Sequence, residues 1–107
     1  MTYEEIVGKV QNQAIQRSAK QIDDHIAVQF NICGEGEGAF YVEISSGHFM
    51  VRPFEYYDRD AVVYVDAETL LDTLAGKVAV ADVTSNGKLV IQGNYDATVK
   101  LLETLAA

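Results

Sequence analysis

Ser85-Asn86-Gly87-Lys88-Leu89-Val90-Ile91-Gln92-Gly93-Asn94-Tyr95 is the stretch around which the rest of the chain is arranged. Asn86-Gly87 supplies the positive φ that a tight reversal needs, and the apolar run after it is a short strand that Gly93 ends. Asn94 then has the side-chain oxygen of a helix N-cap. The stretch therefore predicts a turn, a last strand over residues 88–92 and a final helix over residues 95–105.

The length and composition of the chain fit one globular domain over residues 1–107. Hydrophobic residues make up 49% of the chain and charged residues 22%, which is too apolar for intrinsic disorder. Sixteen Asp and Glu stand against eight Lys and Arg, for a formal charge of -8. Because phosphate groups and anionic membrane surfaces would be repelled, we expect no binding to nucleic acid.

The compartment is predicted from features that the sequence lacks. Cys33 is the single cysteine, so no internal disulfide calls for an oxidising compartment. No apolar run approaches the roughly 18 residues of a membrane span, and the first residues carry acidic groups where a signal peptide would carry basic ones. We expect a cytoplasmic protein that does not insert stably into membranes.

The first helix is predicted from Thr2 and Glu5, which have the spacing of a capping box. Apolar residues then recur at three- and four-residue spacing, which predicts a helix over residues 3–20 with a thin apolar stripe. Such a stripe is suited to packing against a sheet or against another subunit.

Strands are predicted where the apolar period changes to two. Residues 26–33 and 40–44 alternate in this way around a glycine-rich turn, which is typical of a β-hairpin. A third strand ends before Pro53, and because proline lacks the N–H of a central ladder we place this strand at an edge. The β-branched run at residues 61–65 predicts a fourth strand.

The part of the chain between the fourth and fifth strands is predicted to be helical. Asp66 is placed to cap a helix over residues 67–75 that Gly76 ends, and residues 78–84 are interpreted as a short helical or irregular turn. The order of elements predicts a two-layer α+β fold with a five-stranded, mostly antiparallel sheet that helices cover on one face.

Three groups of residues are considered for chemistry and assigned none. The loop Gly34-Glu35-Gly36-Glu37-Gly38 joins two strands, and its carboxylates would repel phosphate. Cys33 has no histidine at a fixed spacing that marks a nucleophile and base, although His25 and His48 are present. Asp23-Asp24-His25 lacks the i, i+4 spacing that brings ligands onto one ion. We therefore expect no catalytic residue, no metal site and no cofactor.

Three stretches resemble the sterol carrier protein family. VQFNI at residues 28–32, with FYVEI at residues 40–44 and Gly47, is similar to the family's opening hairpin. DAVVYVDAETL at residues 60–70, followed by Gly76-Lys77, and GKLVIQG at residues 87–93 are similar to two later segments. The resemblance covers residues 26–105 and depends on the order and spacing of the three stretches together.

The resemblance implies a non-catalytic domain that holds a fatty-acyl chain, a sterol-like molecule or another hydrophobic ligand in an apolar cavity between sheet and helices. The residues that face this cavity, or fill a core in its place, are Phe30, Ile32, Phe40, Val42, Ile44, Leu70, Leu74, Leu89, Ile91, Val99 and Leu102. A filled core would instead favour a protein-interaction module, with a possible homodimer, or an accessory subunit that presents substrate to an enzyme. These alternatives stay open at the level of sequence.

Overall fold

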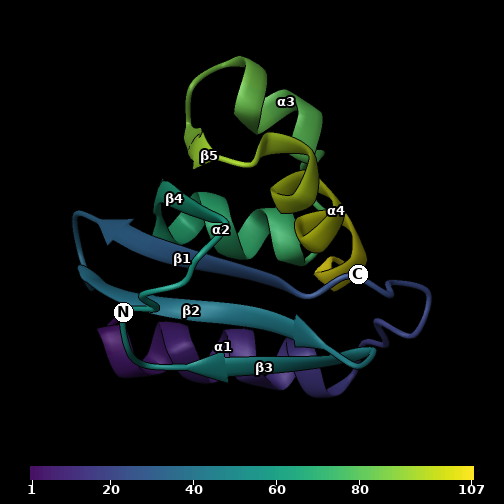
Figure 1. Cartoon of the computed structure of the whole chain (residues 1–107). Coiled ribbons are helices and arrows are strands. Elements are labelled where there is room, and N and C mark those ends of the chain that lie inside the picture. The colour runs from purple at the N-terminus through teal and green to yellow at the C-terminus, as the bar shows by residue number, and fades with distance from the viewer.

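The chain forms a five-stranded sheet and four helices in the computed structural model, which describes residues 1–107 (Figure 1). The predicted order of elements is confirmed, and the stretch predicted as a short helical or irregular turn at residues 78–84 contains a helix that begins at Val80 and ends at Ser85. The elements are α1 (Tyr3–Ile15), β1 (Ile26–Cys33), β2 (Gly38–Ser45), β3 (His48–Arg52), β4 (Ala61–Asp66), α2 (Ala67–Leu74), α3 (Val80–Ser85), β5 (Leu89–Gly93) and α4 (Tyr95–Leu105).

The sheet has the strand order β3-β2-β1-β4-β5, which confirms β3 as an edge strand. Only β1 and β4 are parallel, and the other three pairs are antiparallel. Strand β4 can return beside β1 because the connector after β3 crosses the sheet. The backbone N–H of Asp60 in this connector donates to the Ala27 carbonyl at 2.7 Å, and the Ala27 N–H donates to Asp60 Oδ2 at 2.8 Å.

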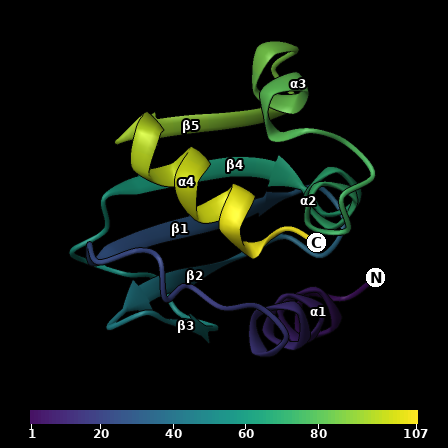
Figure 2. The ribbon, with the colours of Figure 1, turned by 90° about the vertical axis from the view of Figure 1, so that its right-hand side faces the viewer.

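The helices lie on one face of the sheet, and Figure 2 shows α4 in front of β1 and β4 with α1 below it. The strand register places one apolar row after another toward these helices, so that Val28 pairs with Val42 and Phe30 with Phe40. The Phe30 and Phe40 rings stack with centroids 5.3 Å apart. One core of 25 buried residues results, which confirms the predicted α+β architecture.

The polar connector covers part of the opposite sheet face. The Tyr56 N–H donates to Gln29 Oε1 at 3.3 Å, and its hydroxyl donates to Glu43 Oε2 at 3.0 Å. This hydrogen bond raises the pKa of the Tyr56 hydroxyl more than any other contact does, because the phenolate would face the Glu43 carboxylate. His25 also contacts Glu43.

Helix α1 ends at Ile15, so the predicted end near residue 20 is wrong. Ile15 is 82% exposed, and the three residues after it are also exposed, so the apolar stripe has nothing left to pack against the sheet. The chain leaves the helix through the bonds Gln16 N–H to Gln13 carbonyl and Arg17 N–H to Ala14 carbonyl. Ala19 and Ile22 can then insert into the core from irregular backbone.

Candidate functional site

The residues predicted to face a cavity come together in the core. Nine of them are buried, while Ile91 and Val99 are partly buried and pack against the others. Of the eleven, only Leu74 lines one of the five main hollows of the molecule, and all five open to the surface. The five main hollows therefore lie beside the space between sheet and helices, where the predicted residues are in contact with one another.

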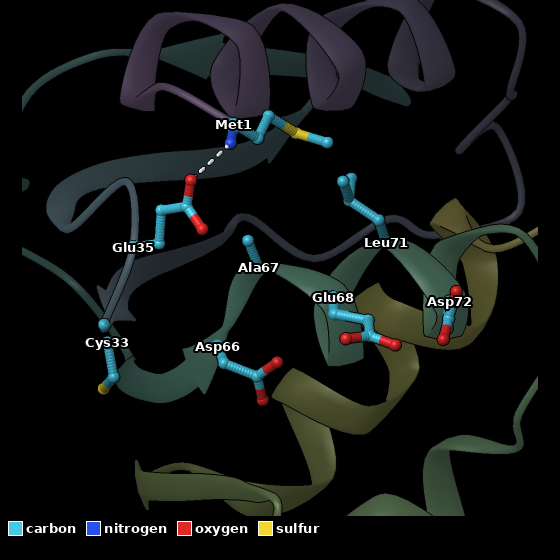
Figure 3. A pocket seen from close by; sticks show the side chains of 9 residues that line it. Met1, Cys33, Glu35, Asp66, Ala67, Glu68, Leu71 and Asp72 are labelled. Atoms are coloured by element: carbon cyan, nitrogen blue, oxygen red, sulfur yellow. Dashed lines mark hydrogen bonds and ion pairs between the residues drawn. The ribbon is translucent and has the colours of Figure 1, made fainter.

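A hollow with a mixed apolar and acidic lining lies between the start of α1, the β1–β2 loop and α2, and it has a volume of about 460 Å³. This value is within the range of roughly 300–1,000 Å³ that is usual for small-molecule sites. Figure 3 shows Ala67 and Leu71 pointing from α2 toward Met1 and α1. The remaining residues that line it are Cys33, Gly34, Glu35, Asp66, Glu68 and Asp72.

A second hollow of about 320 Å³ continues the first along the same two helices. The two share Met1, Leu71 and Asp72, and the second reaches the residues at the end of α2. We name the two hollows together the α1–α2 groove. Its further lining residues are Lys9, Gln13, Leu74, Ala75 and Lys77.

Asp66 sets the direction of the α2 wall because it ends β4 and caps the helix at once. Its Oδ2 accepts the Thr69 N–H at 3.1 Å, and hydrogen bonding from Thr69 holds the pKa of Asp66 below its usual value. The helix thus begins directly after the strand. Ala67 and Leu71, four residues apart, face the groove, while Leu70 and Leu74 face the core.

Glycine allows the loop wall of the groove to approach α1. Gly36 has φ +77°, and a Cβ placed on it would lie 2.5 Å from Ile6 Cδ1 and 2.9 Å from the Met1 carbonyl. A larger residue would push the loop away from the helix. The Met1 ammonium donates to Glu35 Oε1 at 2.9 Å across this end, and the bond raises the pKa of the ammonium group.

Gln13 joins α1 to the ends of α2 and α4. Its Nε2 donates to the Leu74 carbonyl at 3.1 Å and to the Leu105 carbonyl at 3.0 Å. Both carbonyls belong to last helical turns, where the backbone has no partner within its own helix. The sequence does not indicate this role, because a glutamine beside a thin apolar stripe has no local signal that distinguishes a tertiary hydrogen bond from contact with water.

The residues considered for chemistry are spread over both ends of the first hairpin. Cys33 ends β1, whereas His25 precedes the first residue of the same strand. His48 pairs with Ser45 at the hairpin end near His25. No group of three or more His, Cys, Asp or Glu is arranged to hold a metal ion. No helix has the length and apolar character needed to cross a membrane.

The chain matches a family model and several solved structures. The model of the SCP-2 sterol transfer family matches residues 8–106. The solution NMR structure of palmitated SCP2L2 from Aedes aegypti aligns with a TM-score of 0.71 and 21% identity, over 100% of this chain and 96% of that chain. No curated protein sequence matches.

Two further structures place the same fold in other settings. The sec-alkyl sulfatase PisA1 aligns with a TM-score of 0.77 and 13% identity, over 91% of this chain but 16% of the sulfatase. The ubiquinone synthesis protein UbiJ-SCP2 aligns with a TM-score of 0.64 and 15% identity, over 75% of this chain and 68% of that chain. At these identities the likeness concerns the fold.

Proposed function

The chain belongs to the SCP-2 sterol transfer family, and we propose from this premise that it binds the hydrocarbon chain of a lipid in the α1–α2 groove without catalysing a reaction. The family is one of lipid-binding and lipid-transfer domains. The finer proposal concerns the ligand, an acyl or alkyl chain, and the place where it is held.

The observation that carries the proposal is the apolar floor of the groove. Leu71 and Ala67 are partly buried, pack against the hydrophobic core and line the opening. A ligand chain on this floor would remove its own methylene groups from water, at about 0.8 kcal/mol for each one fully buried. We propose that the eleven inward-facing residues form a deeper lining, which a chain reaches only if α2 moves away from α1.

Decanol is a suitable probe, because it carries an apolar chain and no charge. In ¹H–¹⁵N correlation spectra, we expect saturable shifts of the Glu35, Ala67 and Leu71 amides. We expect none at Gly47, which lies in the β2–β3 turn at the opposite end of the strands from Glu35. Leu71→Gln keeps a good helix former at the same site and removes the apolar floor, so we expect at least a tenfold loss of affinity.

The matched control is Val90→Thr, which changes an apolar residue that is 44% exposed on the other face of the sheet. Its affinity for decanol should equal that of the unchanged protein. The absence of saturable shifts, or equal losses in both variants, would contradict the proposal. Native mass spectrometry of the purified protein distinguishes lipid binding from the alternative of a protein-interaction module. Co-purified lipid would favour lipid binding, and a dimer without lipid would favour the interaction module.

A further inference from the structure

The charged residues around the α1–α2 groove are unevenly distributed. The larger hollow is lined by four carboxylates, Glu35, Asp66, Glu68 and Asp72, and by no Lys or Arg side chain. On α2, Glu68 and Asp72 each follow one of the apolar floor residues Ala67 and Leu71. They are therefore rotated by about 100° around the helix and form a rim beside the floor.

Few positive groups offset this rim. The Met1 ammonium is already bonded to Glu35 at 2.9 Å. Lys9 and Lys77 line the second hollow only, and Lys77 Nζ lies 4.0 Å from Asp72 Oδ1 with its side chain 72% exposed. Asp66 and Glu68 have no basic side chain within salt-bridge distance, and Lys88 faces them from a separate hollow that it lines with Asp66, Glu68 and Asp72. An anionic head group above the apolar floor would thus meet carboxylates at close range.

The apolar floor and the acidic rim together specify an amphiphile. Glu68 and Asp72 lie on α2 beside the apolar floor of Ala67 and Leu71, so a polar head group at this edge of the floor would meet both carboxylates. A carboxylate there would be repelled, whereas a hydroxyl or an ammonium group can donate hydrogen bonds to the carboxylates. Partial exclusion of water by the groove walls strengthens both effects.

We infer that the groove selects amphiphiles with a neutral or cationic, hydrogen-bond-donating head group, and that it discriminates against free fatty-acid anions. This inference rests on the proposed function and deepens it, because it names the class of ligand for the same site. Long-chain alcohols, monoacylglycerol-like molecules and alkyl amines share the required chemistry.

Three probes with the same ten-carbon chain test the inference: decanol, decylamine and decanoate, titrated at pH 7.5 and followed through the Ala67 and Leu71 amides. We expect decanoate to bind at least tenfold more weakly than decanol, and decylamine to bind at least as tightly as decanol. The difference in affinity between decanoate and decylamine should become smaller when NaCl is raised from 20 to 500 mM, because salt screens the charges of the rim.

A graded pair of variants tests the rim itself. Glu68→Gln and Glu68→Lys should raise the affinity for decanoate in that order, so that the ratio of decanol to decanoate affinity falls stepwise. Glu103→Lys is the control, since Glu103 is an exposed helical residue on α4 and the same charge is added at a residue that does not line the groove. It should leave the ratio of decanol to decanoate affinity unchanged.

The outcomes separate the two proposals. If none of the three probes shifts the groove amides, the proposed function fails and the selectivity fails with it. If decanoate binds as tightly as decanol, or more tightly, the selectivity alone is overturned. Loss of such binding in Lys77→Gln would then place the anionic head group at the lysine end of the groove. An equal response of Glu68→Lys and Glu103→Lys would overturn the role of the rim.

Discussion

Replacing Gln13 by methionine should destabilise the protein through the ends of two other helices. Methionine is unbranched, has a helix propensity close to that of glutamine and fills a similar volume, but it donates no hydrogen bond. The change therefore removes the bonds of 3.1 Å to Leu74 and 3.0 Å to Leu105 with little effect on α1 itself.

The size of the effect follows from what each carbonyl retains. The Leu74 carbonyl still accepts the Ala107 N–H at 2.8 Å, so it remains partnered. The Leu105 carbonyl loses its side-chain donor in a partly buried place. One bond at a net value of about 1 kcal/mol, plus the cost of a less satisfied acceptor, predicts a loss of about 1–2 kcal/mol in the free energy of unfolding.

Urea unfolding followed by far-UV circular dichroism measures this loss. With a slope of about 1.5 kcal/mol per molar urea, the midpoint should fall by roughly 1 M. Gln16→Met is the control, because Gln16 is exposed and lies one turn further along the same helix end. It should stay within about 0.5 kcal/mol of the unchanged protein. If the two variants unfold at the same midpoint, Gln13 does not act through the two carbonyls.

Two further predictions concern the caps and turns that define the fold. Asp66 has a lowered pKa because its charged form accepts hydrogen bonds from Thr69, so its contribution to stability is present above about pH 3.8 and is lost as the pH falls below that value. Asp66→Asn keeps the cap without the titration, so at pH 7 its free energy of unfolding should match that of the unchanged protein within about 0.5 kcal/mol. Between pH 5 and pH 2.5 the variant should lose less stability than the unchanged protein. An equal loss in both proteins would show that Asp66 does not contribute to the pH dependence. Gly93→Ala should cost at least about 2 kcal/mol, because Gly93 has φ +116° and a Cβ there would lie 2.5 Å from the Asp60 carbonyl oxygen and 2.8 Å from Ala61 Cα. Gly87→Ala, with φ +81° and nothing within 4 Å, should cost only about 1 kcal/mol in the same assay, and equal costs would show that backbone crowding at Gly93 is unimportant.

The parts of the fold that could be predicted are those with a local cause. The side chains of Thr2, Asp66 and Asn94 each accept a backbone N–H at the predicted helix start. The period of two along β1 and β2 likewise identified the row that faces the helices, although Ala27 and Gln29 on the other face of β1 are buried as well, beneath the connector. These signals need only the few neighbouring residues, so the sequence contains them completely.

The end of α1 could not be predicted, because it depends on contacts far along the chain. Residues 16–20 are compatible with a helix by propensity, and tertiary packing decides the matter. The segment that inserts Ala19 and Ile22 into the core lies against the β2–β3 turn, where a Cβ placed on Gly47 would be 3.2 Å from Lys20 Cα. No periodicity within the segment shows that alternative.

The position of the groove was hidden for a related reason. An apolar side chain that faces inward reads the same in a sequence whether it fills a core or lines a cavity, because both place it away from water. Whether a core is filled or a cavity is open depends on the distance between helices and strands that are not consecutive in the chain. Here 51 residues lie between Ile15 at the end of α1 and Ala67 at the start of α2. Their separation is set by Gln13 at one end and by the close approach of Gly36 at the other. Gln13 and Gly36 thus hold α1 and α2 so that Ala67 and Leu71 are left partly uncovered beside the hydrophobic core. A hydrophobic chain gains most from leaving water on this strip.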